Sequence, residues 1–319
     1  MALERKLGMA TRDAYGKALA TLGKTNPDIV VLDADLSKST KTDFFAKEVP
    51  ERFIECGIQE ANMAGVAAGL ALCGLKPYIN SFACFLICKT YDQLRMSVAF
   101  PELNVKAVGS HGGISVGEDG ASQQSIEDFA LAASLPNFAV IAPCDEVSMT
   151  ALVPKIAAYP HPLFMRTGRP KAPIVYDAKN PPKFEIGKGI LLREGKDVAI
   201  FANGLLVFEA LLAAEKLSTE GISASVIDIH TLKPIDQELV VAQAKKTGAV
   251  VSCEEHQIYG GLGSIIAKVL SEKHPVPIEF VAIQDTYAES GTGDQLLEAY
   301  HLTSPYIQSA VKKAISRKK

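Results

Sequence analysis

Apolar residues along the chain form short continuous runs, separated by stretches in which they recur every three or four positions. The run at residues 29–32 predicts a strand buried on both faces, and a helix is expected before it, from a cap at Thr11 to an end at Gly23. Further strands are expected over Tyr78 to Phe82, Val105 to Gly109, Phe138 to Ala142 and Leu163 to Met165. Buried strands that alternate with helices are typical of an α/β fold with a mainly parallel sheet flanked by helices.

The same alternation returns after a segment without periodicity. Gly168 and several prolines punctuate residues 167–187, so we predict a first domain over residues 1–170, a linker over 171–187 and a second α/β domain over 188–319. In the second domain we expect strands over Val198 to Ala202, Ser225 to Ile229, Ala249 to Cys253 and Ile278 to Ile283. Helices are expected near Leu205 to Leu217, Gln237 to Lys246, Leu262 to Glu272 and Thr303 to Ser316.

One predicted strand-to-helix junction carries an acid. A short apolar run from Phe53 ends at Gly57, and small residues then recur at helical spacing until Gly74, which is expected to stop the helix in a left-handed conformation. Glu60 should therefore lie in the first helical turn, where the helix dipole favours a negative charge. Taken alone, this is an ordinary place for an acid that only stabilises a helix.

Other polar residues also follow predicted strands directly. Asp35 and Ser39 follow the strand at 29–32, His111 follows the strand that ends at Gly109, and Arg166 follows the strand that ends at Met165. Ligands of parallel sheets bind beyond the carboxyl ends of the strands, so these side chains are expected to share one edge. Each alone has a structural explanation, as a cap or a surface ion pair. Because all of them are expected at the same edge of the sheet, together they predict a binding site there.

Composition narrows the class of protein. The 319 residues are 48% hydrophobic and 22% charged with a net charge of −3, which gives no reason to expect a nucleic-acid or membrane partner. The six cysteines lie in apolar segments without metal-site spacing, as is typical of a reducing compartment. The N-terminal residues lack a signal-peptide core, and Lys76 interrupts the longest apolar region. We therefore expect a cytoplasmic protein.

A glycine-rich stretch in the second half, Tyr259-Gly-Gly-Leu-Gly263-Ser264, resembles a dinucleotide-binding loop only weakly. The third glycine of that fingerprint is missing, and the loop after the preceding strand is too long for the tight turn. We interpret it as a helix entry. The preceding Cys253-Glu-Glu-His256 is expected at a strand end that contacts the first domain.

The stretch from Phe53 to Gln93, together with His111-Gly-Gly-Ile-Ser-Val-Gly-Glu-Asp-Gly120, resembles the transketolase group of thiamine diphosphate enzymes. The resemblance covers nearly the whole chain and implies a pyrimidine-binding domain followed by the family's C-terminal domain. It further implies that Glu60 hydrogen-bonds the cofactor's aminopyrimidine. A carboxylate at that ring favours the tautomer that removes the thiazolium proton, so Glu60 is implied to be catalytic, and His111 with it.

The resemblance also implies which residues surround the cofactor. Phe82 and Phe85 match the aromatic pocket that packs the aminopyrimidine, where ring stacking adds roughly 1 kcal/mol. Asp35 is implied near the cofactor at a subunit interface, and Ile58 beside the pyrimidine end. Cys88 stands where a further aromatic residue is usual.

A second group of residues is implied to bind the sugar phosphate. A guanidinium suits that role because its planar fork offers paired donors to phosphate oxygens. Gln123 departs from the family, because a histidine usually stands there, and the departure bears on donor preference. The implied substrate residues are Arg12, Ser39, His111, Asp119, Gln123 and Arg166.

The diphosphate-binding motifs of the family do not occur in the sequence. The one Gly-Asp pair, Gly293-Asp294, is followed by Gln, and there is no Asn-Asn pair. The resemblance therefore implies the C-terminal subunit of a split transketolase, with no metal ligands of its own. A separate N-terminal subunit would hold Mg²⁺ and the diphosphate. A homodimer across the small-residue helix at 61–69 is expected, and a tetramer once both chain types assemble.

The implied reaction is the transfer of a two-carbon ketol unit from a ketose phosphate to an aldose acceptor, as in pentose phosphate metabolism. Two alternatives stay open: the β subunit of a 2-oxo acid dehydrogenase, which shares the two-domain plan, and a non-catalytic regulatory homologue. The Gly-Glu-Asp-Gly loop with Arg12 and Arg166 favours the sugar enzyme. The joint presence of Glu60, Phe82, Phe85 and His111 argues against the regulatory homologue.

Overall fold

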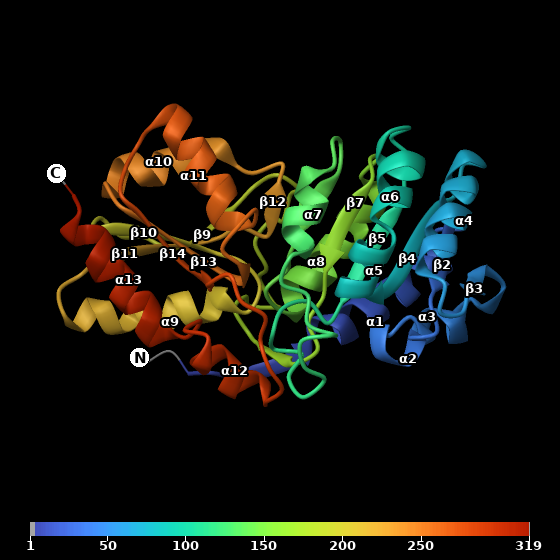
Figure 1. Cartoon of the computed structure of the whole chain (residues 1–319), viewed down its shortest axis with the longest axis horizontal. Helices are drawn as coiled ribbons and strands as arrows, with labels where there is room; N and C mark the ends of the chain where they lie inside the picture. Colours follow the sequence, from blue (N-terminus) through green and yellow to red (C-terminus); the bar gives the residue numbers. More distant parts are fainter. Residues whose placement is uncertain (1–3, 319) are drawn as a thin grey trace.

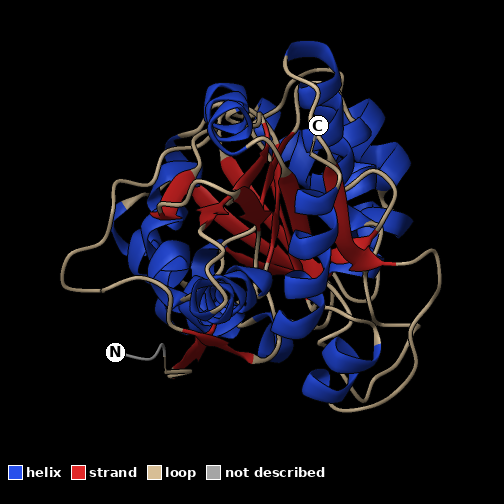
Figure 2. Cartoon of the chain, turned by 90° about the vertical axis from the view of Figure 1, so that its left-hand side faces the viewer, coloured by secondary structure: helices blue, strands red, loops and turns tan. Residues whose placement is uncertain are grey.

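The computed structural model describes residues 4–318, so residues 1–3 of the N-terminal segment and residue 319 lie outside the described residues. Two α/β units stand side by side along the longest axis of the molecule (Figure 1). Viewed from the end, helices enclose the strands (Figure 2). The predicted class, two domains that are each a mainly parallel sheet flanked by helices, is confirmed.

Among the described residues, the larger sheet has seven strands in the order β12-β6-β7-β5-β4-β2-β3. Neighbours are parallel except for the pair of β12 and β6. Most of its strands are buried along their whole length, which explains their unbroken apolar runs. The strands are β2 (Ile29–Asp33), β3 (Phe53–Glu55), β4 (Lys76–Phe82), β5 (Lys106–Ser110), β6 (Ala139–Ile141), β7 (Leu163–Arg166) and β12 (Thr231–Lys233).

Helices cover both faces of this sheet. Helices α1 (Thr11–Thr25), α3 (Asp43–Glu48) and α8 (Glu146–Ala158) contribute to one apolar core. Helices α4 (Glu60–Leu72), α5 (Ala83–Lys89) and α7 (Asp128–Ser134) contribute to the other. The remaining short elements are α2 (Ser37–Thr40), a 3₁₀ turn (Pro50–Arg52), α6 (Tyr91–Gln93) and a π-helical segment (Leu94–Ala99).

The second unit is built on a five-stranded sheet in the order β14-β13-β10-β11-β9, in which only β9 runs antiparallel to its neighbour within the described residues. A separate ribbon pairs β1 (Leu7–Ala10) with β8 (Lys171–Pro173). The strands of the second sheet are β9 (Ile190–Arg193), β10 (Val198–Ala202), β11 (Ala224–Asp228), β13 (Val250–Gln257) and β14 (Ile278–Ile283). The helices are α9 (Leu206–Thr219), α10 (Gln237–Thr247), α11 (Leu262–Lys273), α12 (Gly293–Ala299) and α13 (Ser304–Ser316).

Both predicted ends of the first helix are corrected. Thr11 does not cap α1, because its hydroxyl instead accepts a hydrogen bond from the backbone N–H of Gly168. Gly23 does not end the helix, which continues to Thr25. A Cβ at position 23 would lie 2.3 Å from the ring of Phe45, so this glycine permits close packing of α3 rather than a turn.

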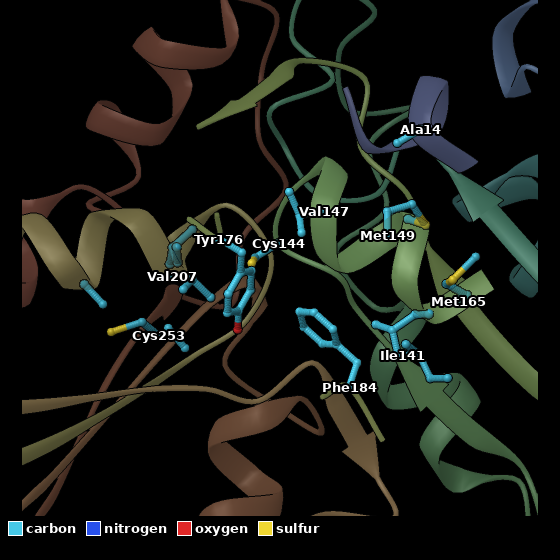
Figure 3. Close-up of a cluster of buried hydrophobic side chains, with 14 of the residues drawn as sticks. Ala14, Ile141, Cys144, Val147, Met149, Met165, Tyr176, Phe184, Val207 and Cys253 are labelled. Atoms are coloured by element: carbon cyan, nitrogen blue, oxygen red, sulfur yellow. The ribbon is translucent and has the colours of Figure 1, made fainter. Parts of the chain in front are cut away.

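Two features of the domain junction were not predicted. Strand β12 belongs by sequence to the second domain but pairs with β6 at the edge of the first sheet. Within the predicted linker, Tyr176 and Phe184 are 5% and 2% exposed and pack edge to face with ring centroids 4.9 Å apart. Figure 3 shows these two rings between side chains of both units, including Ile141 and Cys253. The two units therefore share a continuous core.

The glycine-rich stretch is a helix entry, as predicted. Gly261 is the N-cap of α11, and the Glu254 carboxylate accepts hydrogen bonds from the backbone N–H groups of Leu262 and Gly263. The place that a dinucleotide phosphate would take is thus filled by an internal carboxylate. The predicted contact of β13 with the first unit is also confirmed, because Glu255 accepts a hydrogen bond from the N–H of Ser115.

Among residues 4–318, no helix combines the length and the apolar character needed to cross a membrane.

Candidate active site

Glu60 lies where the sequence placed it, at the first position of α4 and almost fully buried, with 3% exposure. Its carboxylate accepts a hydrogen bond from Ser81 Oγ at 3.3 Å, and Lys89 Nζ lies 3.3 and 3.2 Å from its two oxygens. Gly74, with φ of +89°, follows the end of α4 as predicted. A buried carboxylate with few donors is a group to which a ligand can bind.

Three rings stand in a row beside Glu60. Phe82 ends β4 and Phe85 lies one turn into α5, with centroids 5.7 Å apart and planes inclined by 17°. His111 stacks on Phe82 at 3.9 Å. Because β4 and β5 are neighbouring parallel strands, their ends bring Phe82 and His111 together. The site thus offers aromatic faces beside a carboxylate.

His111 is held in one orientation. Its Nδ1 lies 2.6 Å from Ser110 Oγ and its Nε2 lies 3.1 Å from Arg12 Nη1. A guanidinium can only donate, so Nε2 is the acceptor and Nδ1 carries the proton. Burial, and then the positive charge of Arg12, lowers the pKa of His111 to about 3. The ring is therefore neutral at neutral pH.

Two arginines lie near the His111 end of this row. Arg12 donates from Nη1 to the backbone carbonyl of Ser39 at 3.0 Å, while its buried Nε has no hydrogen-bond partner in the structure. Arg169 donates to Glu118 at 3.1 Å and lies 3.7 Å from Asp119. Both arginines line a cavity of about 470 Å³ at the junction of the two units. An Arg12 Nε–H without a hydrogen bond, beside a second guanidinium at the same cavity, suits an anionic ligand.

Arg166 is not part of this group. Its guanidinium is buried against Phe129, donates to both oxygens of Asp128, and donates from Nη1 to the backbone carbonyl of Glu255 at 2.7 Å. A Cβ on Gly112 would lie 2.3 Å from Arg166 Cδ, so Arg166 supports the 111–117 loop from below. This burial argues against the phosphate role expected for Arg166. Arg169, which the sequence analysis did not select, has the exposure and position for that role.

The remaining candidates lie at the margin. Asp35 is exposed with a left-handed φ of +63°, and its N–H donates to Glu55. Ile58 is 69% exposed. The backbone carbonyl of Gln123 accepts a hydrogen bond from the Cys84 thiol, and its side-chain oxygen accepts one from the Ser122 hydroxyl. Within residues 4–318, none of these three forms a hydrogen bond, an ion pair or a ring contact with Glu60 or with the three rings. A cavity of about 710 Å³ beside α10 shares no lining residue with the site.

Residues 8–174 match the family "Transketolase, pyrimidine binding domain" and residues 187–307 match "Transketolase, C-terminal domain". The chain belongs to the transketolase family. It is the C-terminal part of a transketolase, with Glu60 and the three rings in its pyrimidine-binding domain.

Several transketolase relatives are similar over nearly their whole length. The chain is 43% identical over 301 residues to a "Putative transketolase C-terminal section" of Methanocaldococcus jannaschii, covering 94% of each. It is 42% identical to the "6-deoxy-6-sulfo-D-fructose transketolase subunit SqwH" of Clostridium sp. (strain MSTE9), covering 96% of this chain and 95% of that one. Human transketolase is 36% identical but covered to only 49%. The 2-oxo acid dehydrogenase alternative is therefore not favoured.

Two solved transketolase structures share the fold. One titled "Split gene transketolase, inactive beta4 tetramer" has a TM-score of 0.91 at 49% identity, covering 98% of this chain and all of that one. The other, a transketolase from Campylobacter jejuni, has a TM-score of 0.80 at 23% identity and is covered to 48%. In these relatives the two domains occur either as a separate chain or as half of a longer one.

Proposed function

We propose that this subunit supplies the pyrimidine-binding half of an active site that transfers a two-carbon ketol unit from a ketose phosphate to an aldose acceptor. The observation that carries the proposal is the buried Glu60 carboxylate at the start of α4, beside the stacked rings of Phe82 and Phe85. The transketolase subunits among the relatives support the reaction class.

The site residues fit thiamine diphosphate, the cofactor that the family implies. Among the described residues, the Glu60 carboxylate has a serine and a lysine as its side-chain partners, and aromatic faces adjoin it. This donor set suits a flat heterocycle with a basic ring nitrogen. When bound, thiamine diphosphate supplies a carbon nucleophile that can accept and release a ketol unit. Phe82 and Phe85 would pack the ring, and Glu60 would hold a proton at its nitrogen.

The chain's other residues act on the substrate in this proposal. Neutral His111, whose Nε2 accepts from Arg12, would accept a hydrogen bond from a sugar hydroxyl at Nε2 once Arg12 turns to the phosphate, and this adds no charge to the site. Arg12, whose Nε makes no hydrogen bond within residues 4–318 and lies 3.9 Å from an Asp13 oxygen, and Arg169 would bind the phosphate of the sugar. Ser39, Asp119 and Gln123 stay predicted substrate residues at the margin of the site. A cytoplasmic location also stays a prediction from the sequence.

We propose that a separate N-terminal transketolase subunit completes the site and holds Mg²⁺ with the diphosphate. Within residues 4–318, no group of three or more His, Cys, Asp or Glu side chains is placed to hold a metal ion. Two relatives named as a subunit and as a C-terminal section, each matched over nearly its full length, support a partner chain. Mg²⁺ needs oxygen ligands in near-octahedral geometry, which the partner would provide.

A homodimer of this subunit is proposed across α4. Its outward face exposes Val66 at 37% and Leu72 at 73%, and Gly65 and Gly69 leave open space around their Cα atoms. The π-helical segment packs beside α4 and adds Phe100, 79% exposed, to its end. An apolar face of small residues lets a second copy approach closely. Asp35 and Ile58 lie exposed, where a neighbouring subunit could contact them.

The decisive experiment changes Glu60→Gln in the complex with a separately produced N-terminal transketolase subunit. Amide and carboxyl groups have the same shape, so the fold should persist while turnover falls on the order of 10²- to 10⁴-fold. Ketol transfer is measured with a panel of ketose phosphates and aldose acceptors, and folding by circular dichroism. Glu238→Gln is the control, because Glu238 also lies in a first helical turn but is 91% exposed. Wild-type turnover by the Glu60 variant would refute the proposed role.

A further inference from the structure

Lys89 makes an unusual pair of contacts in the site. It is the last residue of α5, and its ammonium lies within 3.3 Å of both oxygens of Glu60. The same ammonium stands 4.6 Å from the centroid of the Phe85 ring. The Lys89 side chain is 48% exposed, whereas that of Glu60 is 3% exposed. One cation therefore bridges the carboxylate and the aromatic face.

Helix formation alone does not explain this arrangement. A lysine at the C-terminal end of a helix interacts favourably with the helix dipole, and this accounts for the residue type. It does not account for the direction of the side chain, because a half-exposed ammonium is well hydrated when it points to solvent. By turning back to Glu60, Lys89 neutralises a buried charge whose one other side-chain partner within residues 4–318 is Ser81.

We propose that Lys89 is a latch that closes the pyrimidine end of the site in the free subunit. Its two contacts, a polar one with Glu60 and one on the face of Phe85, are those that the site offers to an aminopyrimidine ring. Lysine and ring cannot make both contacts at once, so Lys89 must swing outward before the ring enters. The inference rests on the proposed function, because it takes the pyrimidine site as given.

The latch lowers the apparent affinity of the free subunit without changing the contacts of the bound state. Only the fraction of molecules with Lys89 swung out can accept the ring, and the apparent dissociation constant rises by the inverse of that fraction. The four-carbon stem of lysine is flexible and half exposed, so the outward position needs no change in the backbone. A docked partner subunit that offers Lys89 another anion on its solvent side would open the latch.

The test uses the full-length free subunit and thiamine, which carries the aminopyrimidine but no diphosphate. Lys89→Met keeps the length of the side chain and removes its charge. By calorimetry this variant should bind thiamine about tenfold more tightly than the wild type, a factor that corresponds to about 1.4 kcal/mol. Lys89→Arg should keep the wild-type affinity. The melting temperature of unliganded Lys89→Met should fall, because Glu60 loses its counter-charge, and saturating thiamine should raise it more than in the wild type.

A matched control is available in α3. Lys47 lies 2.7 Å from Asp43 and 5.7 Å from the Phe44 centroid, so Lys47→Met removes the same kind of contacts away from the site and should leave thiamine affinity unchanged. In a Glu60→Gln background, Lys89→Met should bring no gain, because the anion that holds the latch is gone.

The outcomes separate the latch from the function on which it rests. If the wild type binds thiamine and Lys89→Met binds it equally or less tightly, the latch is refuted while the pyrimidine site stands. If neither protein binds thiamine and Glu60→Gln changes nothing, the pyrimidine site and the latch are refuted together. A gain that persists in the Glu60→Gln background would also refute the latch.

Discussion

Arg166 and Arg169 lie three residues apart after β7 and have different surroundings. The Arg166 side chain is 9% exposed and its donors serve Asp128 and backbone carbonyls of both units. The Arg169 side chain is 35% exposed and faces Glu118 and Asp119 beside the cavity that Arg12 also lines. One arginine therefore stabilises the loop, and the other is available to a ligand.

The two arginines should respond differently to substitution. Arg169→Ala removes a charge-assisted contact of roughly 1.5–3 kcal/mol, so the KM for phosphorylated sugars should rise by about 10- to 100-fold and that for unphosphorylated sugars little. Arg166→Met should instead lower the melting temperature, because Asp128 is left buried without a counter-charge. Steady-state kinetics with a phosphorylated sugar and its unphosphorylated counterpart measure the effect of Arg169→Ala. Thermal unfolding measures the effect of Arg166→Met. Equal losses of Arg169→Ala on both substrate types would make Arg169 structural.

His111 gives a pH dependence with a defined sign. The pKa of its folded form is about 3, below the value of 6.5 for an exposed histidine. As the pH falls below 6.5, the unfolded chain takes up a proton that folded His111 does not, so this residue lowers the free energy of unfolding by up to about 1.4 kcal/mol per pH unit. His111→Gln should remove that slope between pH 6.5 and 4. Urea unfolding of both proteins over this range tests it, and parallel slopes would contradict it.

At the scale of elements, α4 has two different faces. Met63, Ala64 and Ala67 are fully buried in the core, while Gly65, Val66 and Leu72 are exposed. Gly65 and Gly69 would normally weaken a helix by about 1 kcal/mol each relative to alanine. Their presence on the outward face makes sense if a second backbone approaches there.

Val66→Arg should therefore prevent self-association of the free subunit. A charged side chain at the centre of this face would be buried without a partner on dimerisation. The dissociation constant of the dimer should therefore rise by a factor of about 10 or more. Sedimentation velocity over a concentration series measures the change. Ala242→Arg on the exposed side of α10 is the control. An unchanged oligomeric state in Val66→Arg would show that α4 is not the interface.

The same contrast explains what the sequence could predict. Long buried strands such as β10 appear as unbroken apolar runs, and the Glu60 junction is marked by an acid followed by small residues, so both were found with near-correct bounds. Strand β12 has three residues and no alternation, and its pairing with β6 depends on the tertiary fold. The burial of Arg166 depends on Asp128, 38 positions away, and no local pattern encodes it. The left-handed φ of +60° at His111 likewise has no sequence signal.

At the scale of the molecule, the two units share one interior. Buried side chains of β7, the 171–187 segment and β10 belong to a single apolar cluster, and Tyr176 donates a hydrogen bond to Asp228 at 2.6 Å. Arg166 adds a polar link to Glu255. Interfaces of this kind couple the folding of adjacent domains.

We therefore expect the free subunit to unfold in a single cooperative transition. Neither unit can lose its structure without exposing the shared core, so calorimetric and van't Hoff enthalpies should agree. Differential scanning calorimetry at several scan rates measures this, and circular dichroism and tyrosine fluorescence should report the same midpoint. Two resolved transitions would show that the units are independent.

The strand β12 limits where nature or an engineer can divide the gene. A chain break anywhere between 174 and 230 would separate β12 from β6. One fragment would then expose β6 as an open sheet edge and the other would carry β12 unpaired, and exposed strand edges promote aggregation. The two units therefore have to be synthesised as one continuous chain. Fusions and reporter insertions should therefore avoid the segment between 174 and 230.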